Sequence, residues 1–394
     1  MKRILAIIWM NLRAVPDRAG SSLVIVIGIA GVVAVLVALL AMAQGFGVTL
    51  KATGQTDRVM FLSAGVTAEL SSVLGPDVVP VLRELPGIAR DAAGKPLASA
   101  EIVVITELKR GTGAQRADVN VSLRGVEPAG LTLRPELKLV EGRWFTPGLR
   151  ELVVGKGAAT QFEGVKLGAV LKFRGSEWTV VGTFSADGDA HESELWTDAD
   201  TARSAFGRGN SASSLLAQMT SAEAIEGIKA SVKADPRLQV DAMPEVEYYA
   251  SQSKQFTEQI GVLTSVVAII MAIGALFGAL NSMYSAVSTR QVEIATLRAI
   301  GFSGLPVVLS VLAEAMLLAL TGGVLGAAIA YVLFNNMSVS TLGANFTQVA
   351  FNFAVTPALM QKGLGWALAI GLLGGLPPAL KAARQPVVEA LRAK

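Results

Sequence analysis

Long stretches of this sequence carry almost no charge, and they constrain the fold more than any other feature. Residues 21–50, 259–289 and 363–380 contain no Asp, Glu, Lys or Arg, and residues 299–361 contain a single charged side chain, Glu314. A helix of about 20 residues crosses the hydrocarbon core of a bilayer. The sequence therefore predicts four transmembrane helices, at 21–45, 258–288, 304–334 and 362–381.

The first stretch has an alternative interpretation as a cleaved signal peptide. Lys2 and Arg3 supply a basic start, and Ala41-Met42-Ala43 has the form of an A-x-A cleavage site. However, the apolar run over residues 23–43 is about twice as long as the core of a signal peptide. We therefore expect this stretch to remain in the protein as a membrane anchor.

Charged residues are concentrated between the first two stretches. Residues 46–257 hold 23 basic and 26 acidic residues, a net charge of −3, whereas the rest of the chain holds 11 basic and 5 acidic ones. The sequence pI of about 9.1 is thus the sum of a mildly acidic domain and basic membrane flanks. It does not indicate a nucleic-acid-binding surface, so we expect lipid and protein partners and no nucleic acid.

The basic flanks predict the orientation in the membrane. Ten of the eleven basic residues outside 46–257 lie on one side of the predicted helices, and the positive-inside rule places that side in the cytoplasm. The exception is Lys362. We expect an amphipathic segment at 1–20, a connector at 289–303 and a tail at 382–394 inside, with the 46–257 domain and a short 335–361 loop outside.

The outer domain is predicted to mix helices and strands. Alternating or β-branched runs at 101–108, 118–126, 151–154 and 177–184 indicate strands. Strand–helix–strand patterns at about 59–90 and 214–242 suggest two βαβ-like units around a β-rich middle. Residues 244–259 read as a helix that runs directly into the second span and could transmit force. The fold class is thus a four-helix membrane bundle carrying an α+β extracytoplasmic domain.

Catalytic chemistry is poorly represented in the residues. The chain has no cysteine and one histidine, which excludes thiol catalysis and zinc sites built from Cys or several His. No G-x-x-x-x-G-K-[ST] loop is present, since Gly94-Lys95 is followed by Pro96 and Gly155-Lys156 by Gly157. We expect a non-catalytic chain that binds no metal or cofactor itself, so any ATP must be hydrolysed by another chain.

One acidic cluster surrounds the single histidine, His191. Asp187, Asp189, Glu192 and Glu194 lie beside it, which would suit a carboxylate–imidazole metal site. Their spacing matches no recognised ligand pattern, so the favoured interpretation is a solvated Gly/Asp loop over residues 185–194 that links two strands.

Two features lie inside the predicted spans. Glu314 is an intramembrane carboxylate, which is costly in lipid, and without a second titratable group it makes a poor proton relay. We expect it to face the bundle and accept hydrogen bonds there. Glycine pairs four residues apart place glycine on one helix face and favour close helix packing. These pairs are Gly274/Gly278, Gly322/Gly326 and Gly371/Gly375.

The connector after the second span reads TRQVEIATLRAIG over residues 289–301. Its spacing predicts a short amphipathic helix with Val292, Ala295, Ala299 and Ile300 on an apolar face and a stop at Gly301. A short surface helix of this kind suits the docking of a soluble partner, and the alternative is a simple connector.

These motifs resemble those of a known family. The runs RQVEIATLRAIGFS and GGVLG, with Glu314 between them, and the ending ARQPVVEALR look like the FtsX-like permease domain of the MacB, LolC/LolE and DevC group of ABC transporters. EGRWF, ELVVG, EWTVVGTF and ELWTD resemble the periplasmic core domain of that group, and NLRAVPDRAGSSL resembles its entry into the first helix. One departure is Gln291, where the family often has Arg.

The resemblance implies a permease subunit in a bacterial inner membrane. It would form a homodimer, or a pseudo-symmetric heterodimer with another permease, and bind two copies of a separate ATPase that holds ATP and Mg²⁺. ATP-driven movement would reach the outer domain and drive export or release of a substrate, often with a periplasmic membrane-fusion adaptor and an outer-membrane channel. The expected ATPase contact comprises Glu293, Thr296, Leu297, Arg298 and Gly301.

Two other functions stay open from the sequence. The chain could be an FtsX-like regulator that controls periplasmic cell-wall hydrolases without transport, or an intramembrane or periplasmic enzyme. The enzyme alternative is weak because no catalytic constellation is visible.

Overall fold

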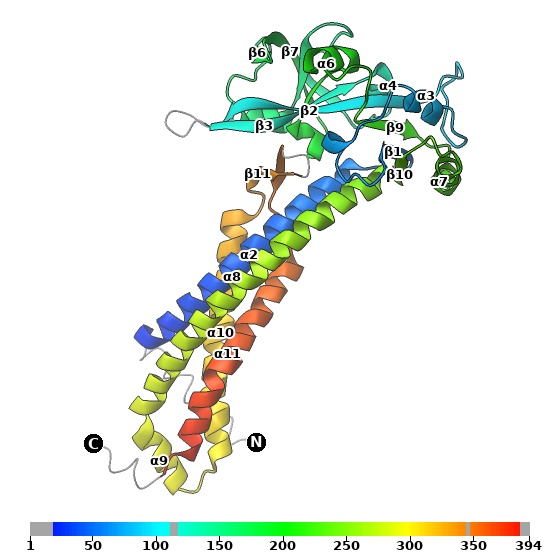
Figure 1. The fold of residues 1–394 in the computed structure, drawn as a ribbon. Helices are drawn as coiled ribbons and strands as arrows, with labels where there is room; N and C mark the ends of the chain where they lie inside the picture. Colours follow the sequence, from blue (N-terminus) through cyan, green and yellow to red (C-terminus); the bar gives the residue numbers. More distant parts are fainter. Residues whose placement is uncertain (1–18, 111–116, 344–346, 387–394) are drawn as a thin grey trace. The chain divides into compact units, whose positions relative to one another are not determined.

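The computed structural model describes residues 19–110, 117–343 and 347–386, and its chain divides into two compact units (Figure 1). Unit 1 comprises the membrane-type helices, and unit 2 comprises residues 45–257 together with residues 338–352. Most of the predicted N-terminal amphipathic segment and most of the C-terminal tail lie outside the described residues.

Four helices in the described part of the chain are long and apolar enough to cross a membrane, as the sequence predicted. The first, second and fourth exceed the predicted spans, because they continue beyond the uncharged stretches, whereas the third has the predicted bounds, 304–334. The four helices are α2 (Ala19–Thr53), α8 (Glu245–Thr289), α10 (Gly304–Phe334) and α11 (Pro357–Arg384), with the short α9 (Gln291–Ala299) between α8 and α10. The continuous α8 spans the predicted 244–259 helix and the second span together, so no break in the backbone separates them.

Glycine allows the closest helix contacts in unit 1. A Cβ atom built on Gly326 of α10 would lie 2.4 Å from the carbonyl oxygen of Ala30 in α2. One on Gly371 of α11 would lie 2.4 Å from Cβ of Ala319 in α10. The pair in α8 differs, because Gly274 and Gly278 have no such neighbour within 4 Å among the described residues. Two of the three predicted glycine faces are thus helix contacts within the chain.

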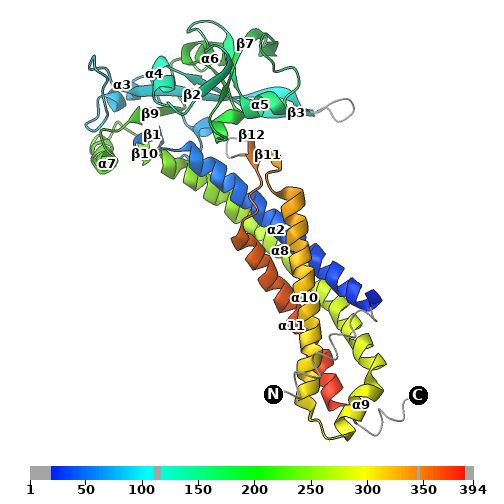
Figure 2. The same cartoon turned by 180° about the vertical axis from the view of Figure 1, so that it is seen from behind.

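Unit 2 is built on one sheet, in which the described residues form ten strands in the order β10-β1-β9-β2-β3-β8-β5-β7-β4, with β6 paired to β7 (Figures 1 and 2). Its first five strands along the chain are β1 (Arg58–Ser63), β2 (Ala98–Arg110), β3 (Ala117–Val126), β4 (Lys138–Gly142) and β5 (Glu151–Gly155). The others are β6 (Val170–Phe173), β7 (Ser176–Ser185), β8 (Leu195–Asp198), β9 (Ser214–Gln218) and β10 (Val240–Pro244).

The two predicted βαβ-like units interleave at one end of this sheet. β9, α7 (Ala224–Ala234) and β10 form one unit, and β1, α3 (Val78–Arg83) and β2 form the other. β1 lies between β9 and β10, and β9 lies between β1 and β2, all antiparallel. This is the ferredoxin-like split βαβ topology, with β3 to β8 inserted between β2 and β9. The second strand of the first unit is β2, which begins at Ala98 and not before residue 90 as the sequence suggested. A turn in which the amide of Asp91 donates to the carbonyl of Lys95 precedes it.

The inserted middle is β-rich, as predicted. Its core packs side chains of β2, β3, β5, β6, β7 and β8 around Trp178, which is fully buried. The short helices α5 (Lys156–Gln161) and α6 (Ala199–Phe206) cover this core, and α4 (Pro128–Thr132) packs against a second cluster around Phe184 and Trp196. The middle also contains one turn of 3-10 helix, η4 (Ala190–Ser193), and the ferredoxin-like end contains another, η2 (Glu69–Ser71).

The region between α10 and α11 is more ordered than the simple loop that the sequence predicted. It forms an antiparallel hairpin of β11 (Ser338–Leu342) and β12 (Gln348–Asn352). The hairpin belongs to unit 2, where the amide of Ala350 donates to Ser193 Oγ at 2.8 Å and the ring of Phe351 lies 5.5 Å from Phe46. Short alternation of this kind was too brief to be recognised as strands in the sequence.

Candidate functional site

One residue, Arg290, separates the end of α8 from the start of the short helix α9. Gly301 follows α9 with a φ of +100°, a conformation that glycine adopts at little cost, and this agrees with the predicted helix stop. The sequence thus specifies both ends of the connector.

The rotation of α9 differs from the sequence prediction. Ile294 and Ala295 are buried, whereas Val292 is 49% and Ile300 is 68% exposed. Ala299 is also exposed, so of the predicted apolar face only Ala295 points inward. Ile294 and Leu297 instead line a cavity with residues of α8 and α10. The reason is the anchoring of Arg290, which fixes the start of α9 in a rotation that periodicity alone cannot predict.

Arg290 holds that rotation through the intramembrane acid. Its Nη1 donates to Glu314 Oε2 at 3.1 Å, both side chains are buried, and its Nε lies 3.4 Å from Glu293. Glu314 therefore faces the bundle and accepts hydrogen bonds, as expected. The sequence prediction missed its partner. A basic residue at the end of one apolar span and an acid in the next is the signal that could have identified the pair.

The remaining predicted contact residues divide into two groups. Glu293 and Thr296 are exposed on α9, and Thr296 Oγ1 donates to the carbonyl of Val292 at 2.7 Å. Leu297 and Arg298 are half-buried, and the Arg298 guanidinium donates to the carbonyl oxygen of Gln385 just after α11. Arg298 thus ties α9 to the end of α11, a role that the sequence did not indicate.

The His191 cluster lies in unit 2 and is buried, so the predicted solvated loop is wrong for its central residues. Asp189 and His191 are 3% and 1% exposed. His191 Nδ1 lies 3.0 Å from Asp189 Oδ2, and its Nε2 lies 3.2 Å from the hydroxyl of Tyr249. Asp187 alone of the four acids is strongly exposed, and it pairs with Lys138. Within the described ranges, no group of three or more His, Asp or Glu is arranged to hold a metal ion.

A larger charge network lies beside this pair. The buried Arg124 guanidinium donates to the carboxylates of Glu69, Glu101 and Glu194 at 2.8 to 3.0 Å. Arg134 donates both Nη groups to Glu101 at 2.6 and 3.0 Å. The network joins η2, β2, β3 and Glu194, the residue that separates η4 from β8. Charged residues inside the apolar runs of β2 and β3 are the signal in the sequence that could have identified this network.

Electrostatics differ between the two clusters. Burial opposes ionisation of Glu69, but Arg124 outweighs it and lowers the pKa of Glu69 to about 2. In the smaller cluster, burial raises the pKa of Asp189 to about 7 and lowers the pKa of His191 to about 3. Glu69 is therefore ionised at neutral pH, whereas the His–Asp pair holds one proton between about pH 3 and pH 7.

These features define a class of protein: a membrane protein with four apolar helices, a short connecting helix and one mixed α/β domain inserted between its first two spans. The model of the MacB-like periplasmic core domain family matches residues 21–235, and that of the FtsX-like permease C-terminal family matches residues 265–387. The chain belongs to the FtsX/MacB-type family of ABC transporter permeases, and the resemblance seen in the sequence is confirmed.

Solved structures similar to this chain include two outer domains. The extracellular domain of the noncanonic ABC-type transporter YknZ from Gram-positive bacteria is 19% identical, with a TM-score of 0.33, over 44% of this chain and 88% of that one. The periplasmic region of MacB from Actinobacillus actinomycetemcomitans is 14% identical, with a TM-score of 0.36, over 53% and 94%. No curated protein matches the sequence.

Proposed function

We propose that this chain is the membrane-spanning subunit that couples a separate ATPase to movement of the outer domain, and that α9 is the ATPase contact. The observation that carries the proposal is an exposed stripe on α9. Val292, Thr296, Ala299 and Ile300 recur at helical spacing on one side, and all four are exposed. Glu293 lies beside this stripe. An apolar helix face at a connector between spans is the kind of surface that a soluble partner buries.

The contacts behind α9 support a coupling role. The Arg290–Glu314 pair links the start of α9 to α10, and the Arg298 bond to Gln385 links its end to α11. A displacement of α9 by its partner would therefore be transmitted to α10 and α11 through these contacts, and to α8 through the connecting backbone at Arg290. Movement of α8 would pass into the outer domain, because this helix continues into unit 2.

The proposed assembly follows the family. Two copies of the permease, or this chain and a related one, would bind two ATPase subunits. The permease would lie in a bacterial inner membrane, with both termini and α9 on the cytoplasmic side. ATP and Mg²⁺ would be bound by the ATPase, and the outer domain would act on substrate with a periplasmic adaptor and an outer-membrane channel. Substrate export or release and hydrolase control both use this coupling step, so the experiment addresses the step that they share.

The test changes the stripe and leaves the intrachain contacts intact. Val292→Asp with Ile300→Asp places two charges on it, whereas Arg298→Glu would also break the bond to Gln385. We expect the tagged full-length variant to lose most of the ABC ATPase that co-purifies with the wild type in mild detergent. The matched control is Leu139→Asp with Val140→Asp on β4, where both residues are 38% or more exposed. Wild-type recovery and activity of the ATPase with the α9 double variant would contradict the proposal.

A further inference from the structure

The middle of unit 2 contains a sheet that curls around one core but leaves a seam. Following the pairing β2-β3-β8-β5-β7-β6, all six strands contribute to the core around Trp178. β2 and β6 are the two ends of this series, and the described residues record no pairing between them. A groove of about 570 Å³ is lined by residues 105–109 of β2 on one side and 170–173 of β6, with Arg174, on the other.

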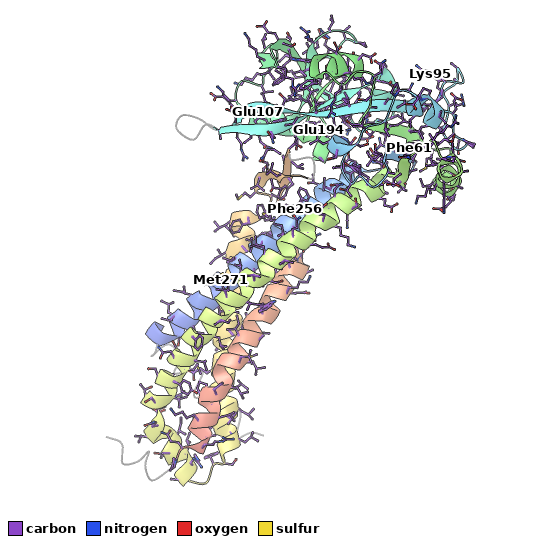
Figure 3. The ribbon with its side chains drawn as sticks, in the orientation of Figure 1. Phe61, Lys95, Glu107, Glu194, Phe256 and Met271 are labelled. Carbon is purple, nitrogen blue, oxygen red and sulfur yellow. The ribbon has the colours of Figure 1, made fainter. Side chains whose placement is uncertain are left out.

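We propose that this groove, which we name the β2–β6 seam, binds an extended polypeptide segment of a partner protein by strand addition. The proposal is independent of ATPase coupling, because it concerns unit 2 and none of the residues of α9. Figure 3 labels Glu107, which lies on β2 within the seam.

The backbone of β2 has hydrogen-bonding groups aimed into the seam. The N–H and C=O of one residue point to the same side of a strand, and the side alternates along it. The amide of Val103 donates to Ser213 Oγ, and the carbonyl of Lys109 accepts from the amide of Glu163 at 3.2 Å, both on the side away from β3. Ile105 and Glu107 share this orientation. Among the described residues, no backbone bond is recorded for them on that side.

β6 offers the same arrangement on the opposite wall. Phe173 and Ser176 close a two-residue turn at Arg174-Gly175, where both residues have positive φ. Phe173 and Leu171 therefore bond to β7, and the backbone groups of Val170 and Lys172 point away from it. Within the part of the chain that the structure describes, β6 has no second strand partner.

These unpaired edges identify the kind of occupant. Two rows of backbone donors and acceptors match an extended peptide, whereas a compact small molecule would satisfy few of them. Val103 and Lys109 already have partners on that side, so the free edge of β2 runs from Ile105 to Glu107, about 7 Å, enough for about three residues of strand. Leu108, Leu171 and Phe206 line the same groove, so alternate side chains of the peptide should be apolar. The positive charges of Lys109 and Lys172 on the rim oppose non-specific pairing of the seam with the strand edges of other copies of the chain.

The experiment uses the full-length chain in lipid nanodiscs and a phage-displayed library of random heptapeptides as the probe. Enriched peptides are synthesised with a fluorophore, and their Kd is measured by anisotropy. Glu107→Pro removes the N–H aimed into the seam but keeps the ladder to β3, and proline is tolerated at such an edge. Glu107→Ala keeps that N–H and serves as the matched control.

We expect enriched peptides to bind the wild type and Glu107→Ala with Kd values within threefold. Binding to Glu107→Pro should be at least tenfold weaker, and N-methylation of the peptide should weaken binding at successive positions, because its amides alternate between β2 and β6. Near-UV circular dichroism of the buried Trp178 tests folding, and Lys172→Pro with Lys172→Ala repeats the test on β6. Failure to enrich any peptide, equal binding to the proline variants, or an N-methyl series without effect on binding would overturn the proposal.

Discussion

At the scale of single residues, unit 2 depends on buried charges that must stay paired. Arg124 contacts three carboxylates with almost no exposure to solvent. Breaking a buried ion pair by removing one partner typically costs about 3 to 5 kcal/mol, because the remaining charges lose their compensation. This arrangement makes the network sensitive to a single substitution.

We predict that Arg124→Leu destabilises unit 2 by about 3 to 5 kcal/mol, since Glu69 and Glu194 would lose a shared cation. Denaturant unfolding of the full-length chain in micelles, followed by tryptophan fluorescence, measures the change. Lys138→Ala removes one partner of an exposed ion pair and should cost less than about 1 kcal/mol. If the two variants lost similar free energy of unfolding, burial of the Arg124 network would not be what makes it important for stability.

The His191–Asp189 pair predicts a second effect, on the pH dependence of stability. In an unfolded chain Asp titrates near pH 4 and His near pH 6.5, so between these values the two residues hold about one proton. The folded pair, with a pKa of about 7 for Asp189 and about 3 for His191, also holds one. Its contribution to the free energy of unfolding should therefore be flat across this window.

Asp189→Asn should remove the carboxyl whose raised pKa offsets the lowered pKa of His191. His191 would stay buried with a lowered pKa, so the unfolded state would bind more protons than the folded state below about pH 6.5. Stability of the variant should then fall as the pH is lowered from 6.5 to 4.5, by up to about 1.4 kcal/mol per pH unit. Unfolding midpoints at three pH values decide the matter. Parallel curves for variant and wild type would mean that the pair does not share a proton.

At the scale of elements, the sequence predicted which helices and strands form far better than it predicted the contacts between them. The absence of charge was enough to place four helices, since lipid tolerates few alternatives. Alternating or β-branched runs identified β2, β3, β5 and β7, and Gly301 marked the end of α9. The rotation of α9 and the buried environment of His191 could not be predicted, because both depend on residues distant in the sequence, Glu314 in one case and Tyr249 in the other.

The glycine faces provide a prediction at this scale. Gly326→Leu should lower the thermal stability of the detergent-solubilised chain, because its Cβ alone would meet the backbone of α2, and overpacking of this kind costs about 1 to 3 kcal/mol. Gly278→Leu makes the same change in α8, where the added Cβ meets nothing within 4 Å, and should have little effect. Melting temperatures from size-exclusion chromatography of heated samples distinguish the two. Equal losses would show that the α10–α2 contact is not close.

At the scale of the whole molecule, orientation in the membrane is the property with the widest consequences. We predict that unit 2 is extracytoplasmic and that the turn between α9 and α10 is cytoplasmic, because the basic residues cluster around that turn and the termini. Single cysteines at the exposed Asn210 and Ser303 test this in a chain that otherwise has none. A membrane-impermeant thiol reagent should label Asn210→Cys in intact spheroplasts and spare Ser303→Cys until the membrane is broken. The reverse pattern would invert the topology.

The β11–β12 hairpin has a consequence for biosynthesis. The chain leaves unit 1 for unit 2 after residue 44, returns after 257, leaves again after 337 and returns after 352. During translation, unit 2 therefore stays incomplete until the third span and the hairpin that follows it have emerged from the ribosome. Until then the ring of Phe46 lacks its neighbour Phe351. The final closure of unit 2 thus awaits insertion of the third span, so a nascent chain arrested before residue 352 should remain open to proteases and chaperones outside the membrane.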